Sequence, residues 1–271
     1  MKIAVIISGE YRTFSVARKS MKFLDNPNVD IYFSTWDRSL FYNKRARLQV
    51  SDPVTESQIR SVIGRDATMI VEPSNLITER KYNTKMIYRW LRGFELVEQS
   101  GKEYDFVIVT RPDIIFDNTH PCNLDNILEY KNLLGMGWFS QTWVGKLSDI
   151  IFIASFRNMK LLMNALTIDD WISSPEHDWH IWWYNHVMKF FSVADIRPFE
   201  SVNHFTFCRF WVKPEHTFIE AYNIQLDWRD LILLGQLDEW GRDKAIIAWP
   251  DQILPAAEEK WNSGYFNKYI A

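Results

Sequence analysis

Cysteine is nearly absent from this chain of 271 residues, which contains only Cys122 and Cys208. Two cysteines do not make a disulfide framework, so we expect a reducing compartment: the cytoplasm, or the host cytoplasm if the gene is viral. A large charge of one sign is also absent, because the formal net charge is −3 at pH 7. This charge balance gives no electrostatic basis for nucleic acid as the main partner.

No hydrophobic run is long enough to cross a bilayer, so we expect a soluble protein without a transmembrane segment. The first residues, MKIAVIISGEYRTF, lack a small-residue cleavage site, and the charged residues Glu10 and Arg12 follow directly after the short apolar stretch. Both features favour a first strand over a signal peptide. Glycine-rich phosphate motifs are missing too. The stretch SGEYRT has one glycine and matches neither a dinucleotide fingerprint nor a phosphate loop.

Aromatic side chains, by contrast, are abundant. They make up 15% of the residues, with 13 Trp, and several Trp cluster at 179, 182 and 183 and at 138 and 143. An aromatic-rich core and a surface that stacks sugars or bases both explain this composition. With 47% hydrophobic residues the chain can bury a sizeable core.

Strand and helix patterns alternate over the first 117 residues. Short apolar runs closed by glycine, proline or polar residues predict buried strands, and a period of 3.6 residues predicts helices. This alternation is typical of an α/β fold with a mainly parallel central sheet flanked by helices. The predicted strands are 2–8, 29–34, 67–72 and 105–110, and the predicted helices are 12–24, 55–63 and 83–100. Lys85 and Arg89 in the last helix are interpreted as solvated-face charges, with a contact to phosphate as the less common alternative.

The pattern changes after residue 120. Strands are predicted at 133–139 and 149–154, and helices at 157–166 and 175–191. The last helix would begin at Pro175-Glu176, because proline and acidic residues are favoured in a first turn.

Polar residues follow three of the predicted strands. In parallel sheets the carboxyl ends of the strands share one edge, and ligands bind beyond it. The three groups expected to meet there are Ser8-Gly9, Thr35-Trp36-Asp37 and Arg111-Pro112-Asp113. An aspartate at such an edge can hold Mg or Mn, which prefer carboxylate oxygens and leave room for phosphates. The alternatives are a surface ion pair of Arg111 with Asp113, or an Asp113 that caps the next turn.

Five stretches in order over roughly residues 1–190 resemble glycosyltransferases of the GT-A type, in particular short bacterial and phage sugar-transferase-like proteins. They are KIAVIISGEYRTF, DIYFSTWD, YDFVIVTRPDIIFD, DIIFIASFRNM and SPEHDW. The resemblance implies one Rossmann-like domain over 1–271, with a nucleotide-binding half (1–117) and a mixed-sheet and helical acceptor half with the C-terminal tail (118–271). It implies transfer of a sugar from a nucleoside diphosphate sugar, by expectation a UDP-sugar, to a glycan or other hydroxyl acceptor.

The family's Asp-x-Asp motif, which holds Mn or Mg, corresponds to Arg111-Pro112-Asp113, so only Asp113 remains as a metal ligand. Arg111 is a candidate for a phosphate oxygen, since a guanidinium pairs well with phosphate. The resemblance also implies that the nucleotide lies against the first two strand ends. By this resemblance the nucleotide would contact Ser8, Gly9, Arg12, Thr35 and Asp37.

Glu176, with Asp178 as second choice, matches the carboxylate that serves as general base in inverting members of the family. Both acids also suit a helix N-terminus. The resemblance further implies sugar contacts by Asp149, and Trp179 beside the acids is a candidate for stacking on a sugar, although core burial explains it equally well.

Three functions are weighed. The first is the metal-assisted glycosyltransferase. The second, favoured by the missing first acid at position 111, is a non-catalytic nucleotide- or carbohydrate-binding relative. The third, a nucleotidyltransferase, usually has a glycine- and arginine-rich loop that SGEYRT does not match. Stereochemistry and oligomeric state, a homodimer included, stay open.

Overall fold

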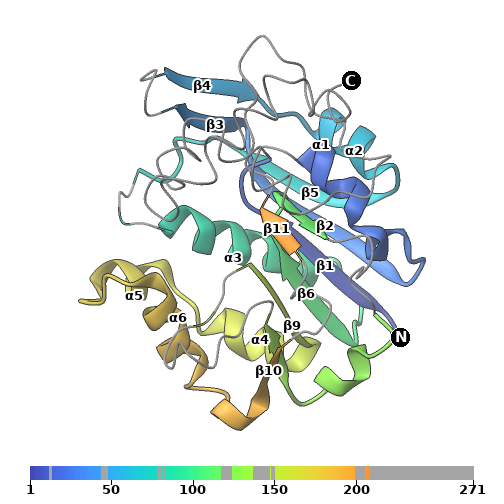
Figure 1. The fold of residues 1–271 in the computed structure, drawn as a ribbon, viewed down its shortest axis with the longest axis vertical. Helices are drawn as coiled ribbons and strands as arrows, with labels where there is room; N and C mark the ends of the chain where they lie inside the picture. The colour runs from blue at the N-terminus through green and yellow to red at the C-terminus, as the bar shows by residue number, and fades with distance from the viewer. Residues whose placement is uncertain are drawn as a thin grey trace, which may run out of the picture.

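A computed structural model describes residues 1–11, 14–43, 48–78, 81, 83–116, 124–136, 147, 150–198 and 205–207. A seven-stranded sheet runs through the centre of the molecule (Figure 1). In spatial order its strands are β10 (Ile196–Pro198), β8 (Leu134–Met136), β9 (Ile151–Ser155), β6 (Phe106–Thr110), β1 (Ile3–Ser8), β2 (Val29–Trp36) and β5 (Ala67–Glu72). Strand β9 is antiparallel to both neighbours, and the other pairs are parallel. The predicted mainly parallel α/β sheet is confirmed.

Local signals in the sequence explain the elements that lie close to their predicted bounds. Helix α2 (Glu56–Ile63) begins at a capping box, in which the Thr55 hydroxyl accepts from the Gln58 amide at 3.2 Å and the Gln58 side chain accepts from the Thr55 amide at 3.0 Å. The helix ends at Gly64, which adopts a φ of 72°. Helix α3 (Thr84–Gln99) presents Ile87, Trp90, Phe94 and Val97 to the core at helical spacing.

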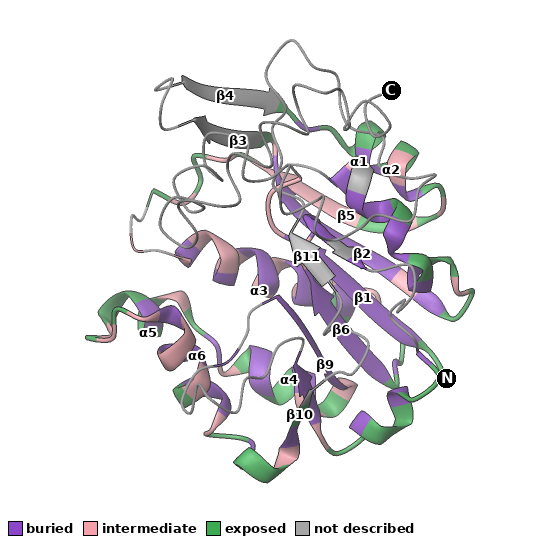
Figure 2. Ribbon diagram, in the orientation of Figure 1, coloured by how far each residue is buried: buried purple, intermediate pink, exposed green. Residues whose placement is uncertain are grey.

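Helices cover both faces of the sheet. Alternate residues of β1 point to opposite faces, with Ile3, Val5 and Ile7 on one and Ala4 and Ile6 on the other. Helices α1 (Phe14–Ala17) and α2 pack on the first face. Helix α3 packs on the second, together with α4 (Phe156–Asn164), α5 (Ile168–Ser173) and α6 (Trp179–Val187). Figure 2 shows β1 and β6 buried along almost their whole length between these layers.

The helix predicted over 12–24 is wrong in most of its length. Only α1 is α-helical, and it is followed by 3-10 turns at Arg18–Ser20 and Lys22–Asp25. Tertiary contacts replace the helical pattern there, because Arg18 donates to the Ile63 carbonyl at 3.1 Å and the Phe116 amide donates to the Ser20 hydroxyl at 3.0 Å. Two further 3-10 turns lie at Ile127–Tyr130 and Val193–Asp195.

Sequence patterning also missed some elements. The hairpin of β3 (Arg38–Asn43) and β4 (Leu48–Pro53) was not expected, nor was α5. A second small sheet pairs β7 (Ile114–Phe116) antiparallel with β11 (Phe205–Phe207). The helix predicted over 175–191 begins at Trp179, because Pro175-Glu176 belongs to the turn before it.

The longest helix of the described ranges is α3, with 16 residues. Among the described residues, no helix has the length and apolar character that a bilayer crossing requires. Strands from both predicted halves of the chain, 1–117 and 118–271, pair in one sheet. A single domain over 1–271 stays a prediction.

Candidate functional site

The carboxyl ends of β6, β1 and β2 lie side by side, as predicted. Ser8 pairs in register with Ser34 of β2, and Ile7 pairs with Thr110 of β6. Three groups of polar residues therefore meet at one edge of the sheet: Ser8-Gly9, Thr35 to Asp37, and Thr110 to Asp113. We call this edge the rim.

Three hydroxyl groups at the rim are buried without a hydrogen-bond partner in the described structure. They are Ser8 Oγ, Thr35 Oγ1 and Thr110 Oγ1, on side chains that are at most 1% exposed. Buried hydroxyls normally have a partner, and leaving one unpaired costs about 1–3 kcal/mol. These three groups lie on the adjacent ends of β6, β1 and β2. Sequence reasoning selected Ser8 and Thr35 but missed Thr110.

Gly9 brings the exit of β1 against Pro112. Its φ is 134°, which side chains rarely adopt, and a Cβ at this position would meet Pro112 Cδ at 3.3 Å. Gly9 thus lies close to the proline of the Arg-Pro-Asp turn, and its contact with a nucleotide stays a prediction. The contact between Gly9 and Pro112 connects the β1 and β6 ends of the rim.

Arg111 and Asp113 form a two-pronged ion pair across Pro112. Arg111 Nε donates to Asp113 Oδ1 and Nη2 donates to Oδ2, both at 2.8 Å. The Asp113 side chain is 2% exposed and that of Arg111 is 17% exposed. Parallel N–H···O bonds of this kind are among the strongest and most directional in proteins. Of the predicted alternatives, the ion pair is present, and it is buried on the carboxylate side.

The β2 end of the rim is held by a buried arginine. Arg89 of α3 is fully buried, donates to the Thr35 carbonyl at 2.7 Å, and pairs with Glu72 at the end of β5. Its guanidinium lies 3.7 Å from the centre of the Trp36 ring, which stacks on Tyr88. Burial lowers the pKa of Arg89, and the Glu72 carboxylate opposes that shift.

The interpretation of Arg89 as a solvated-face charge is wrong. The signal that could have found it is Gly93, one turn further along the same helix face. A Cβ at Gly93 would lie 2.4 Å from Ile6 Cγ2, so α3 approaches the sheet closely at this glycine. Arg89, four residues earlier on the same helix face, is buried by this close approach.

Asp37 joins β2 to the segment after β5. Its Oδ1 accepts from the Ser74 amide at 2.8 Å, and its own amide donates to the Glu72 carbonyl at 2.8 Å. One carboxylate oxygen is thus engaged in shaping the rim. A contact from Asp37 to a ribose stays a prediction.

Glu176 and Asp178 differ in how they use their oxygens. Asp178 is the N-cap of α6, accepting from the His180 and Ile181 amides through Oδ1 at 2.9 and 3.4 Å. Glu176 Oε1 accepts from the amides of His177 and Asp178 at 2.9 and 2.8 Å. In the described structure Glu176 Oε2 makes no hydrogen bond. Oε1 therefore orients the carboxylate, and Oε2 can accept a proton or a hydrogen bond.

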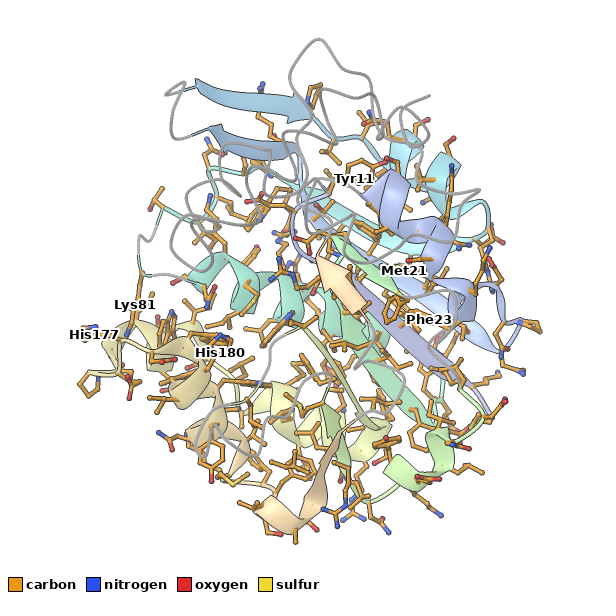
Figure 3. All side chains as sticks on the ribbon, in the orientation of Figure 1. Tyr11, Met21, Phe23, Lys81, His177 and His180 are labelled. Carbon is orange, nitrogen blue, oxygen red and sulfur yellow. The ribbon has the colours of Figure 1, made fainter. Side chains whose placement is uncertain are left out.

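Neither acid contacts Arg111, Asp113 or the strand ends of the rim among the described contacts. Figure 3 shows His177, next to both acids, at the left edge of the view and Tyr11, which follows β1, near its upper centre. Trp179 is 2% exposed and contacts the rings of Trp90, Trp171, Trp182 and Trp183. The structure therefore places Trp179 in the core, the alternative to stacking on a sugar.

The described residues do not fit the predicted Mn or Mg site. Both Asp113 oxygens accept from Arg111, and no group of three or more His, Cys, Asp or Glu in the described ranges could hold a metal ion. Hard cations in proteins take several oxygen ligands. Arg12 and Asp149, predicted to contact the nucleotide and the sugar, lie outside the described residues.

No protein-family model matches the chain, and no curated protein matches its sequence. Three solved structures illustrate what its fold is similar to. Apo GlyE, a glycosyltransferase of Streptococcus pneumoniae TIGR4, is 15% identical with a TM-score of 0.41, over 73% of this chain and 45% of GlyE. A glycosyltransferase involved in glycosylation of the major capsid of PBCV-1 is 7% identical with a TM-score of 0.39, over 73% and 82%.

The galactosyltransferase LgtC, solved with donor and acceptor sugar analogs, is 10% identical with a TM-score of 0.38, over 73% of each chain. All three are glycosyltransferases. This chain spans less than half of the length of GlyE. At these TM-scores the likeness is one of coarse arrangement and assigns no residue of the site.

Proposed function

We propose that this chain is a glycosyltransferase that moves a sugar from a nucleoside diphosphate sugar, with UDP as the expected nucleotide, to a hydroxyl of a glycan or other acceptor. The observation that carries the proposal is the rim. Three adjacent strand ends of a mainly parallel sheet carry buried hydroxyls that have no partner among the described residues, next to Arg111, whose guanidinium is fixed by two hydrogen bonds to Asp113. A nucleotide offers such a rim both hydrogen-bonding groups and phosphate charge.

The chain's own residues suggest the division of labour. Ser8, Thr35 and Thr110 lie where a nucleoside would meet the strand ends, and Arg111 lies where its phosphates would follow. The acceptor hydroxyl loses its proton to a general base as its oxygen attacks C1 of the sugar, and Glu176, whose Oε2 makes no hydrogen bond in the described structure, is the candidate that the family resemblance gives. The bond from C1 to the diphosphate oxygen breaks, and Arg111 offsets the negative charge that remains on the diphosphate. No step is assigned to Mn or Mg.

The first test is binding and turnover. Calorimetric titration with UDP, GDP and ADP, followed by measurement of diphosphate release from the corresponding sugars with hydroxyl acceptors, addresses each part of the proposal. Binding together with acceptor-dependent release supports it. Binding without turnover of any donor favours the non-catalytic relative, which the arginine in place of the first motif acid motivates. Absence of nucleotide binding removes both.

The second test separates the two acids. Glu176→Gln should lower kcat at least about 10²-fold with an unchanged Kd for UDP, because the amide cannot take a proton. Asp178→Ser should keep kcat within about threefold, because serine also caps a helix. The reverse pattern would transfer the role of general base to Asp178, and equal retention by both variants would remove both acids from the mechanism.

A further inference from the structure

The Arg-Pro-Asp turn presents its arginine, and not its aspartate, to the outside of the rim. The Asp113 side chain is 2% exposed, whereas that of Arg111 is 17% exposed. Asp113 precedes Ile114, which is fully buried at the start of β7. The carboxylate thus lies on the core side of the pair, and a ligand that approaches the rim meets the guanidinium first.

Both oxygens of Asp113 are already used. They accept from two different nitrogens of one guanidinium at 2.8 Å each, which is the arrangement that best matches the planar fork of arginine to a carboxylate. To ligate a dication, Asp113 would give up these charge-assisted bonds and place the dication beside a guanidinium of the same sign. The described residues also hold no group of three metal-ligating side chains that would compensate for this loss.

The same contacts make Arg111 a preorganised cation. Asp113 fixes the plane and direction of the guanidinium, and Pro112 fixes the turn that carries both residues by lying against Gly9. A charge held in this way needs no reorganisation when a phosphate arrives. Arg111 lies next to the ends of β1 and β6. The diphosphate of a nucleotide whose nucleoside is bound at these strand ends would reach this position.

We propose that Asp113 is a positioning residue rather than a metal ligand, and that Arg111 itself binds the donor diphosphate, so that nucleoside diphosphate binding needs no divalent cation. This inference rests on the proposed function. During transfer the C1–oxygen bond breaks with its electron pair on the diphosphate, and Arg111 stays protonated throughout.

The deciding measurement uses the wild-type chain and UDP. Calorimetric titration in excess EDTA and in saturating Mn²⁺ should give dissociation constants that agree within about threefold. EDTA removes only the divalent cation, and in this proposal the cation makes no contribution to UDP binding. A Kd that is tenfold or more weaker in EDTA would overturn the inference and leave the proposed function standing. Absence of UDP binding in both conditions would overturn both.

Variants then assign the roles. Arg111→Ala should weaken UDP binding at least about tenfold in EDTA while the affinity for uridine is unchanged, because the lost bonds are to phosphate. Asp113→Asn should weaken UDP binding in the same selective way, since an amide cannot accept both N–H groups of the fork. Arg111→Lys should fall between wild type and Arg111→Ala, because it keeps the charge without the fork.

Lys160→Ala is the matched control. It removes an exposed cation that is paired with Glu98 on the helices of one sheet face, and should leave the Kd for UDP unchanged. The inference fails if Arg111→Ala binds UDP like wild type, or if Asp113→Asn loses only the part of the affinity that depends on Mn²⁺. Far-UV circular dichroism checks that the variants fold, and if one does not, the EDTA comparison on the wild type decides.

Discussion

At the scale of single residues, the candidate site depends on side chains and glycines that hold one another in place. Arg111 is oriented by Asp113, and the turn between them lies against Gly9. Arg89 similarly holds the Thr35 carbonyl and the Trp36 ring. The positions of Arg111 and Thr35 in the rim therefore depend on the side chains of Asp113 and Arg89.

Gly9→Ala should destabilise the chain and weaken UDP binding together. The variant places a Cβ 3.3 Å from Pro112 Cδ and forces alanine to a φ of 134°, with an expected loss of about 1–3 kcal/mol in the free energy of unfolding. Displacement of Pro112 would also move Arg111. Urea denaturation and UDP titration measure the two effects.

Gly64→Ala is the control for this substitution. Gly64 also has a positive φ, of 72°, but a Cβ there would meet nothing within 4 Å. It should lose stability through backbone strain alone and keep the wild-type Kd for UDP. Equal UDP affinity in both glycine variants would contradict a role for the Gly9–Pro112 contact at the rim.

At the scale of elements, α6 combines a polar start with an aromatic body. Asp178 caps the helix, and Trp179, Trp182, Trp183 and His186 follow at a spacing that stacks their rings along one side. The His186 ring is 2% exposed, and its Nε2 donates to the Leu162 carbonyl at 3.2 Å. Burial of this kind disfavours the charged form of a histidine.

His186→Phe should make stability less dependent on pH. Burial lowers the pKa of His186 below its ordinary value of 6.5, and Lys189 lowers it further, whereas the Leu162 carbonyl and Asp170 oppose the shift. The unfolded chain therefore takes up this proton first. The stability contributed by neutral His186 is present above pH 6.5 and is lost as the pH falls below that value toward the folded-state pKa.

Urea denaturation from about pH 8 to about pH 5 measures this effect, because the wild type should lose stability relative to the variant as the pH falls. A constant difference for His186→Phe would show that its protonation is not linked to folding.

At the scale of the whole molecule, one sheet and one aromatic cluster connect the early and late parts of the chain. Strand β9 pairs antiparallel with β6, and the Trp183 ring contacts Trp90 of α3 and Phe152 of β9. Trp183 is fully buried. Because these contacts cross residue 117, the predicted nucleotide and acceptor halves share a core.

Trp183→Ala should lower the free energy of unfolding by about 3–5 kcal/mol, as expected for a large buried ring. If the halves unfold together, the transitions followed by far-UV circular dichroism and by tryptophan fluorescence should coincide and shift together. Leu128→Ala, at a side chain that is 65% exposed, should change stability by less than about 0.5 kcal/mol. Two separate transitions, one of them unmoved, would refute a shared core.

The sequence by itself determined most of the order of strands and helices and the edge at which polar groups gather. Local periodicity and caps carry that information, as in β5 at its predicted bounds and in the capping box at Thr55. The resemblance in five motifs added the expectation of a glycosyltransferase.

Only the tertiary structure decided which of the candidate side chains are buried and which partners the charged ones bind. Burial of Arg89 and the core position of Trp179 depend on how closely α3 and α6 approach the sheet. Such distances join residues far apart in the chain, and no periodicity along the sequence encodes them. For Asp113 the sequence left a metal ligand, a turn cap and an ion pair with Arg111 open, and the structure shows the ion pair.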